Sequence, residues 1–202
     1  MQLAPWLSAG LWGLLAGGAL VLGACAGYYL RVPARLIAMI MGFGSGVLIS
    51  AMSFELMEVA YRKGGFNAAA LGLVAGAVAY TIANRIVSRY GAKHRKRSSG
   101  KQPSEKESGG SGTAIAIGAL LDGVPEAIVI GLSMLEGGKV SRVAVAAIFL
   151  SNIPEGLSSA AGMKRAGRSA LYVFGVWGGI ALVSGAGALI GFSVFEHLPL
   201  EA

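Results

Sequence analysis

Acidic residues are scarce in this chain, and some of them lie in the middle of apolar stretches. The chain has 10 Asp and Glu residues, and three of them, Asp122, Glu126 and Glu155, are flanked on both sides by hydrophobic runs. A carboxylate at the centre of a bilayer costs on the order of 3 kcal/mol, so such groups usually face a polar interior and mark an ion or proton path. Their placement predicts a cation site inside a membrane.

The spacing of these carboxylates repeats in a second segment. Asp122 and Glu126 are four residues apart, so a helix places both on one face. Ser151 and Glu155 have the same spacing, and Asn152 adds an amide oxygen at almost the same depth. These side chains predict two half-sites of oxygen ligands for a metal ion.

Each half-site also contains a proline. Pro125 and Pro154 have no amide donor, which releases the carbonyl four residues earlier from its helical hydrogen bond. At membrane depth such backbone is tolerated only where it is buried in protein or lines a water-filled cavity. Residues 122–128 and 151–157 align without gaps. Because consecutive spans run in opposite directions, this is an inverted repeat, and broken helices at corresponding positions of two halves indicate a transporter site.

Histidine and cysteine, the usual nitrogen and sulfur ligands of metals, are almost absent. With only His94 and His197 a histidine-rich site is excluded, and the single Cys25 excludes a disulfide framework or a thiolate cluster within one chain. We therefore expect a site made mostly of oxygen, and no prosthetic group. His94 is expected to be a solvated loop residue, with a cytoplasmic role in relaying metal as the alternative.

The composition indicates an all-α integral membrane protein. Of the 202 residues 54% are hydrophobic and 13% charged, whereas a soluble domain carries about a quarter charged residues. About 20 apolar residues cross a bilayer. This length predicts a six-helix transmembrane bundle with a retained first span, and the spans are 6–30, 36–59, 68–87, 113–135, 143–163 and 170–195.

Basic residues predict the orientation of these spans. Lys and Arg gather after the first, third and fifth spans, so the positive-inside rule places both termini outside. Residues 91–112 are predicted to form a flexible cytoplasmic loop. This loop divides helices 1–3 (residues 1–90) from helices 4–6 (residues 113–202), and the predicted metal site belongs to helices 4–6. The basic residues behind the net charge of +7 lie in the segments between the spans, where they set the orientation of the protein. The charge therefore does not indicate nucleic acid, and the expected partner is the lipid bilayer of the cell (inner) membrane.

The two proline segments resemble motifs of the ZIP (ZRT/IRT-like) family. Its fourth and fifth helices carry a His-Asn-x-Pro-Glu-Gly type motif and a related Pro-Glu-Gly motif, and residues 42–56 and 170–175 look like the bacterial branch. The resemblance implies transport of divalent ions (zinc, iron or manganese) and the first six helices of an eight-helix fold. It also implies a metal site between helices 4 and 5, made by Asp122, Glu126, Ser151, Asn152 and Glu155.

The chain departs from the family pattern in its ligands. The histidine of the fourth helix is Asp122 here, and the asparagine after it is Gly123. Imidazole suits zinc, whereas carboxylate, carbonyl and water suit manganese, magnesium or calcium, so a preference for zinc is weakened. The sixth span has no acidic residue, which predicts one metal ion rather than a binuclear site.

Several readings stay open at this point. Glu55 and Glu58 near the outer end of the second span are either solvated interfacial groups or part of an entrance. The methionines of that span, Met39, Met41, Met52 and Met57, are expected to be packing residues rather than soft ligands. Glycine faces such as Gly72 and Gly76 permit close packing within one chain or in a homodimer.

Two other functions compete with transport. Paired carboxylates at depth suit an intramembrane hydrolase, but that reading leaves the prolines and the inverted repeat unexplained. A non-transporting metal sensor or scaffold related to ZIP transporters is the stronger alternative, because the motif histidine is missing. Metal flux separates a carrier from a sensor.

Overall fold

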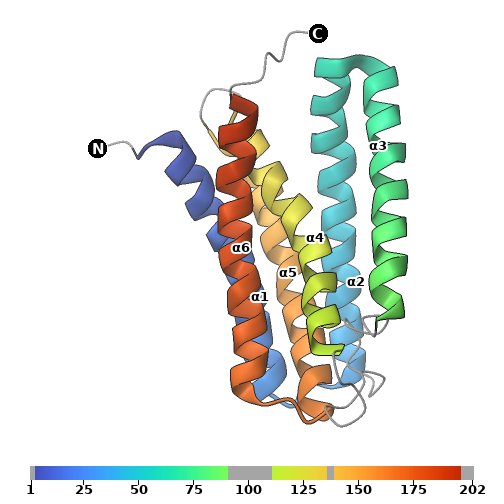
Figure 1. The fold of residues 1–202 in the computed structure, drawn as a ribbon, viewed down its shortest axis with the longest axis vertical. Coiled ribbons are helices and arrows are strands. Elements are labelled where there is room, and N and C mark those ends of the chain that lie inside the picture. Colours follow the sequence, from blue (N-terminus) through green and yellow to red (C-terminus); the bar gives the residue numbers. More distant parts are fainter. Residues whose placement is uncertain (1–2, 91–110, 136–138, 197–202) are drawn as a thin grey trace.

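The part of the chain that the computed structural model describes, residues 3–90, 111–135 and 139–196, is helical and contains no strand, which confirms the all-α prediction. The elements in chain order are α1 (Pro5–Tyr29), α2 (Ala34–Ala51), the short π-helix η1 (Met52–Leu56), α3 (Met57–Arg89), α4 (Ser111–Ser133), α5 (Arg142–Arg165) and α6 (Ala170–Glu196) (Figure 1). The predicted loop 91–112 lies outside the described residues, except that α4 already begins at Ser111.

The connection between the second and third predicted spans, residues 60–67, contains the reversal of the chain. Before that reversal the helix continues from α2 through η1 into the first turns of α3, beyond the predicted end of the second span at residue 59. An ion pair between Glu58 and Arg62, 2.5 Å long and one turn apart, supports this extension. The chain reverses at Gly65, whose φ of 70° lies in the left-handed region that glycine adopts without steric cost.

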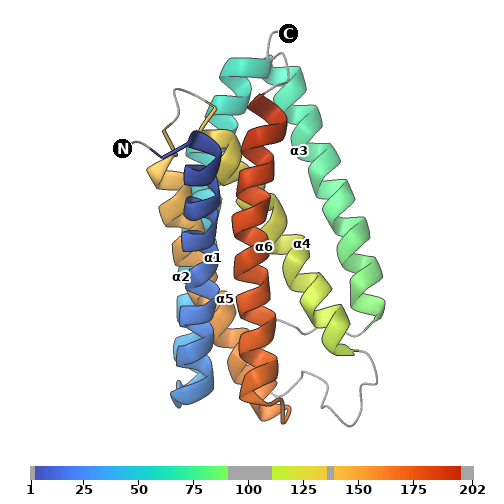
Figure 2. The same cartoon turned by 60° about the vertical axis from the view of Figure 1, so that its left-hand side comes forward.

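The helices form an elongated bundle with alternating directions (Figure 1). The start of α1, the reversal at Gly65 and the end of α6 lie at one end, and the α1–α2 and α5–α6 turns lie at the other. The most extensive contacts join α1 with α5 and α6, α4 with α6, and α2 with α5. Within the described residues α3 contacts only η1 and α4, and Figure 2 shows it standing to one side of the bundle.

Small residues fill the interior and large apolar ones cover the outside. Ala9 and Ala16 are buried, whereas Leu15 is 50% and Leu171 is 86% exposed. The crossing of α1 and α5 depends on glycine, since a Cβ on Gly156 would lie 2.1 Å from the carbonyl oxygen of Leu20. Helices in lipid associate through such close contacts, because hydrocarbon tails are as apolar as leucine.

Several helices fit a multi-pass membrane protein. Among the described residues, four helical stretches are long and apolar enough to cross a bilayer: Pro5–Tyr29, Ala34–Arg89, Arg142–Arg165 and Ala170–Glu196. The second of these contains the reversal at Gly65 and therefore runs along the bundle twice. Helices satisfy all backbone hydrogen bonds internally, as a hydrocarbon surrounding requires.

Candidate metal centre

A cavity of about 450 Å³ lies between α2, α3, α4 and α5, and we call it the carboxylate cavity. At about 30 Å³ per water molecule it has room for an ion with its hydration shell. Four of the five predicted ligands line it, and its described lining residues are Met41, Ser45, Leu48, Met52, Tyr80, Leu121, Asp122, Pro125, Glu126, Ser151, Pro154 and Glu155.

Helical spacing brings the carboxylates to this cavity. Asp122 and Glu126 are one turn apart on α4, and Ser151 and Glu155 are one turn apart on α5. All four side chains are partly buried. Because α4 packs mainly on α6 and α5 mainly on α1 and α2, the two carboxylate helices face each other across the cavity with few direct contacts.

The prolines do not break their helices. Both α4 and α5 continue through Pro125 and Pro154, so the expected pair of broken helices is not present, although each proline still removes one helical hydrogen bond. Both rings line the carboxylate cavity. Pro154 also contacts α2, since a Cβ on Gly44 would lie 2.7 Å from its Cγ atom.

Asn152 is not brought together with the other predicted ligands. Its side chain is 5% exposed, and its amide donates a 2.9 Å hydrogen bond to the carbonyl oxygen of Ala16 on α1. One residue along a helix turns the side chain by about 100°, so Asn152 faces α1 while Ser151 and Glu155 face the cavity. Its observed contact is one of packing between α1 and α5.

Two polar residues of the cavity were missed in the sequence. Ser45 comes from the α2 face that also presents Met41 and Leu48, and Tyr80 comes from α3. The hydroxyl of Tyr80 donates a hydrogen bond to the carboxylate of Asp122. A tyrosine inside an apolar span rather than at its interfacial end is the signal that points to such a role.

The charged side chains that line the carboxylate cavity in the described part of the chain are all acidic. The described lining residues of the cavity include Asp122, Glu126 and Glu155 but no Lys or Arg. Like charges in a poorly solvated space repel each other, and a bound cation or proton relieves that repulsion. Even so, in the described part of the chain no three His, Cys, Asp or Glu side chains are grouped closely enough to hold one ion together. An ion in this cavity would therefore keep water among its ligands.

A second cavity lies towards the end of the bundle where α1 begins, and we call it the vestibule. It has about 460 Å³ and is lined by residues of η1, α3, α4 and α6, including Glu55, Lys63 and Ser133, and by Ser141, which directly precedes α5. Ser141 links these elements. Its hydroxyl donates to the carboxylate of Glu55 and accepts a 3.1 Å hydrogen bond from the amide of Ala144 at the start of α5.

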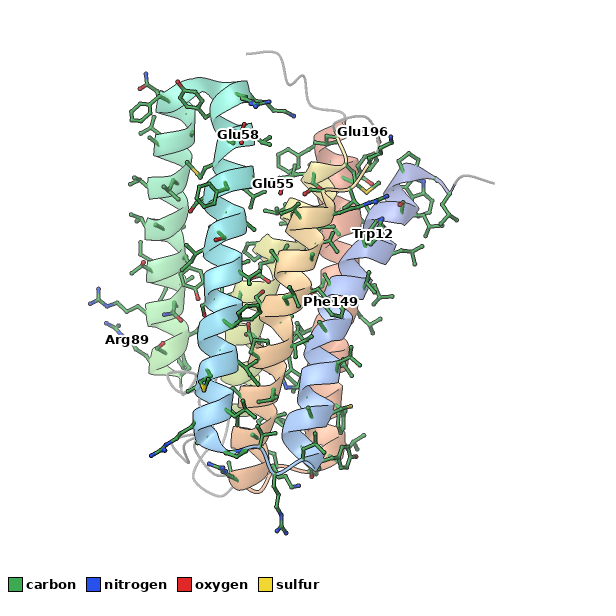
Figure 3. The ribbon with its side chains drawn as sticks, turned by 180° about the vertical axis from the view of Figure 1, so that it is seen from behind. Trp12, Glu55, Glu58, Arg89, Phe149 and Glu196 are labelled. Atoms are coloured by element: carbon green, nitrogen blue, oxygen red, sulfur yellow. The ribbon has the colours of Figure 1, made fainter. Side chains whose placement is uncertain are left out.

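Glu55 and Glu58 differ in their surroundings. Glu55 points from η1 towards the start of α5, and Glu58 lies nearer the end of the bundle (Figure 3). Glu58 pairs with Arg62 on the exposed surface, and its side chain lines neither the vestibule nor the carboxylate cavity. Of the two, only Glu55 belongs to a cavity on the way to the buried carboxylates.

A small cavity of about 130 Å³, apolar apart from Glu126, lies between the vestibule and the carboxylate cavity, and we call it the constriction. It shares Leu56 and Val129 with the vestibule, and Leu48, Met52, Pro125 and Glu126 with the carboxylate cavity. Glu126 is the one charged group among its described lining residues. The three cavities therefore form a line from one end of the bundle to the carboxylates, narrowest at the constriction.

No family model, no curated protein and no solved structure matches this chain. The resemblance to the ZIP family stays a prediction that depends on the two proline segments.

Proposed function

We propose that this protein carries divalent transition-metal ions, such as zinc, iron or manganese, across a membrane through the carboxylate cavity, as ZIP transporters do. The observation that carries the proposal is the cavity itself. Two helices supply three carboxylates to it, and its described lining has no basic residue. An acidic, partly buried space in an otherwise apolar bundle suits a small cation better than any other cargo.

The proposed topology has six spans in the cell membrane, with both termini outside and residues 91–112 in the cytoplasm. The charges at the two ends of the bundle support this orientation. The end where α1 meets α2 holds the larger number of described basic residues, Arg31, Arg35, Arg85, Arg89, Lys164, Arg165 and Arg168 (Figure 1). The end that holds the vestibule has fewer, Arg62, Lys63, Lys139 and Arg142, and also carries Glu58 and Glu196 (Figure 3). By the positive-inside rule the vestibule then opens outside.

The line of cavities suggests the order in which the cargo meets its ligands. Glu126 lines both the constriction and the carboxylate cavity, so it is the first buried carboxylate on the way in. Asp122 lies one turn further along α4 towards the basic end. Neutralising Glu126 or Glu155 by a proton would weaken the hold on the ion and favour its release.

The constriction is the step that must open. Apart from Glu126 its described lining is apolar, and a narrow apolar space excludes a hydrated ion, as hydrophobic gates do. Met52 and Leu56 of η1 form one side of it, and Val129 of α4 and Ile148 of α5 form the others. A movement of α2 and η1 against α4 and α5 would widen it, and single turns of π-helix often occur at such functional positions.

Metal uptake into proteoliposomes tests the proposal. The native chain should take up Zn²⁺, Mn²⁺, Cd²⁺ or, without oxygen, Fe²⁺, and the double variant Glu126→Gln with Glu155→Gln should take up none above protein-free liposomes. Glu58→Gln is the matched control, because that carboxylate is exposed and lines neither the vestibule nor the carboxylate cavity.

Three results would separate the readings. No uptake by the native chain means that it is not a carrier, and metal binding without uptake favours the sensor or scaffold. Uptake by the double variant at the native rate places the path elsewhere.

A further inference from the structure

Tyr80 occupies an unusual position for a residue of α3. This helix has no buried residue, and within the described part of the chain it contacts only η1 and α4. Among the described lining residues of the carboxylate cavity, Tyr80 is nevertheless the one contributed by α3. Its hydroxyl donates to the Oδ1 atom of Asp122.

A neutral hydroxyl donor is well suited to hold a carboxylate that must also bind a cation. Lys or Arg at this place would neutralise Asp122 and compete with the ion, whereas a phenol adds no charge. The hydrogen bond fixes the position of the Oδ1 atom, and with it the plane of the carboxylate. Partners of this kind fix the orientation of a metal ligand, and their loss typically costs 10–100-fold in metal affinity.

We propose that Tyr80 is a positioning residue that fixes the carboxylate of Asp122 for the cargo ion. This inference rests on the proposed function, because it assigns the bond a role in binding metal. It also makes α3 part of the metal centre, although the carboxylates all belong to α4 and α5.

A double-mutant cycle tests the inference. Zn²⁺ and Mn²⁺ binding is measured by calorimetry on the full chain in lipid nanodiscs for the native protein, Tyr80→Phe, Asp122→Ala and the double variant. Tyr80→Phe keeps the ring and removes only the donor, and it should weaken binding about tenfold. In the Asp122→Ala background the same change should have no effect, because the acceptor is gone.

Tyr61→Phe is the matched control. Tyr61 also lies on α3, is 57% exposed and lines neither the carboxylate cavity nor the vestibule. The control should bind both ions as the native chain does. Thermal unfolding of each variant shows that the fold is kept, so that a weaker affinity reports on the cavity.

The outcomes distinguish this inference from the proposed function. If Tyr80→Phe binds metal as the native chain does, or weakens binding equally in both backgrounds, Tyr80 does not act through Asp122 and the inference is wrong. If the native chain binds neither ion, the proposed function is wrong and the inference falls with it.

Discussion

Gly44 of α2 lies directly against the ring of Pro154 in α5, so that a Cβ at this position would be 2.7 Å from the proline Cγ atom. The contact lies beside the carboxylate cavity, whose lining includes Ser45 on one side and Pro154 and Glu155 on the other. The proline ring has no rotamer that clears the space, so α2 would have to move away from α5.

We expect Gly44→Ala to destabilise the protein and to weaken metal binding. Overpacking of this kind typically costs about 1–3 kcal/mol. Gly42→Ala is the control, because nothing lies within 4 Å of a Cβ placed there. Thermal unfolding and Mn²⁺ calorimetry of both variants in nanodiscs check the prediction. Equal behaviour of the two alanine variants would show that the width of the cavity does not depend on this contact.

The constriction predicts a variant that binds metal but does not transport it. Val129 belongs to both the constriction and the vestibule, so Val129→Phe should fill the junction between them. We expect uptake from the vestibule side to fall by more than about tenfold, because the apolar gate cannot open around the larger ring. Equilibrium binding in detergent should be kept, since the carboxylates are unchanged and both ends of the protein are accessible.

Val194→Phe is the matched control for this variant, because Val194 lies on α6 and is 52% exposed. It should transport at the native rate. If Val129→Phe transports as well as this control, the ion does not pass through the constriction.

The methionines of the carboxylate cavity provide a test of its ligand chemistry. Met41 and Met52 line the cavity, and Met57, although close to Glu58 in the sequence, does not. If the cargo is held by oxygen, changing both to leucine conserves the volume and leaves uptake of Mn²⁺ and Cd²⁺ within about twofold of the native rates. A selective loss of Cd²⁺ uptake would instead identify the thioethers as soft ligands.

Helical periodicity explains most of what the sequence predicted about this cavity. Asp122 and Glu126 on one helix, and Ser151 and Glu155 on the next, share a face because they are four residues apart. The same rule explains the misplaced Asn152. It neighbours Ser151 in the sequence, but the rotation of the helix turns it towards α1, where it bonds to the carbonyl of Ala16. The sequence spacing alone did not show which face of α5 lies against α1 and which lies against the cavity.

Other features were not predicted from the sequence. They include the π-helical turn Met52–Leu56 and the continuation of the helix beyond residue 59 to Gly65. The approach of Tyr80 to Asp122 joins residues 42 positions apart, so it follows from the placement of α3 beside α4. The ends of α1, α5 and α6 lie close to the ends of the predicted apolar stretches, where charged residues or turns flank the hydrophobic runs.

The most direct test of the account is to locate the metal. Crystals of the full chain soaked in Mn²⁺ or Zn²⁺ would show the ion by its anomalous scattering. We predict one peak in the carboxylate cavity, bonded to at least two of the carboxylates of Asp122, Glu126 and Glu155 at about 2.0–2.2 Å for zinc, with water completing its ligands. A peak at Glu55 or Glu58 alone, or none in the cavity at concentrations that support uptake, would contradict the claim that the carboxylate cavity holds the cargo.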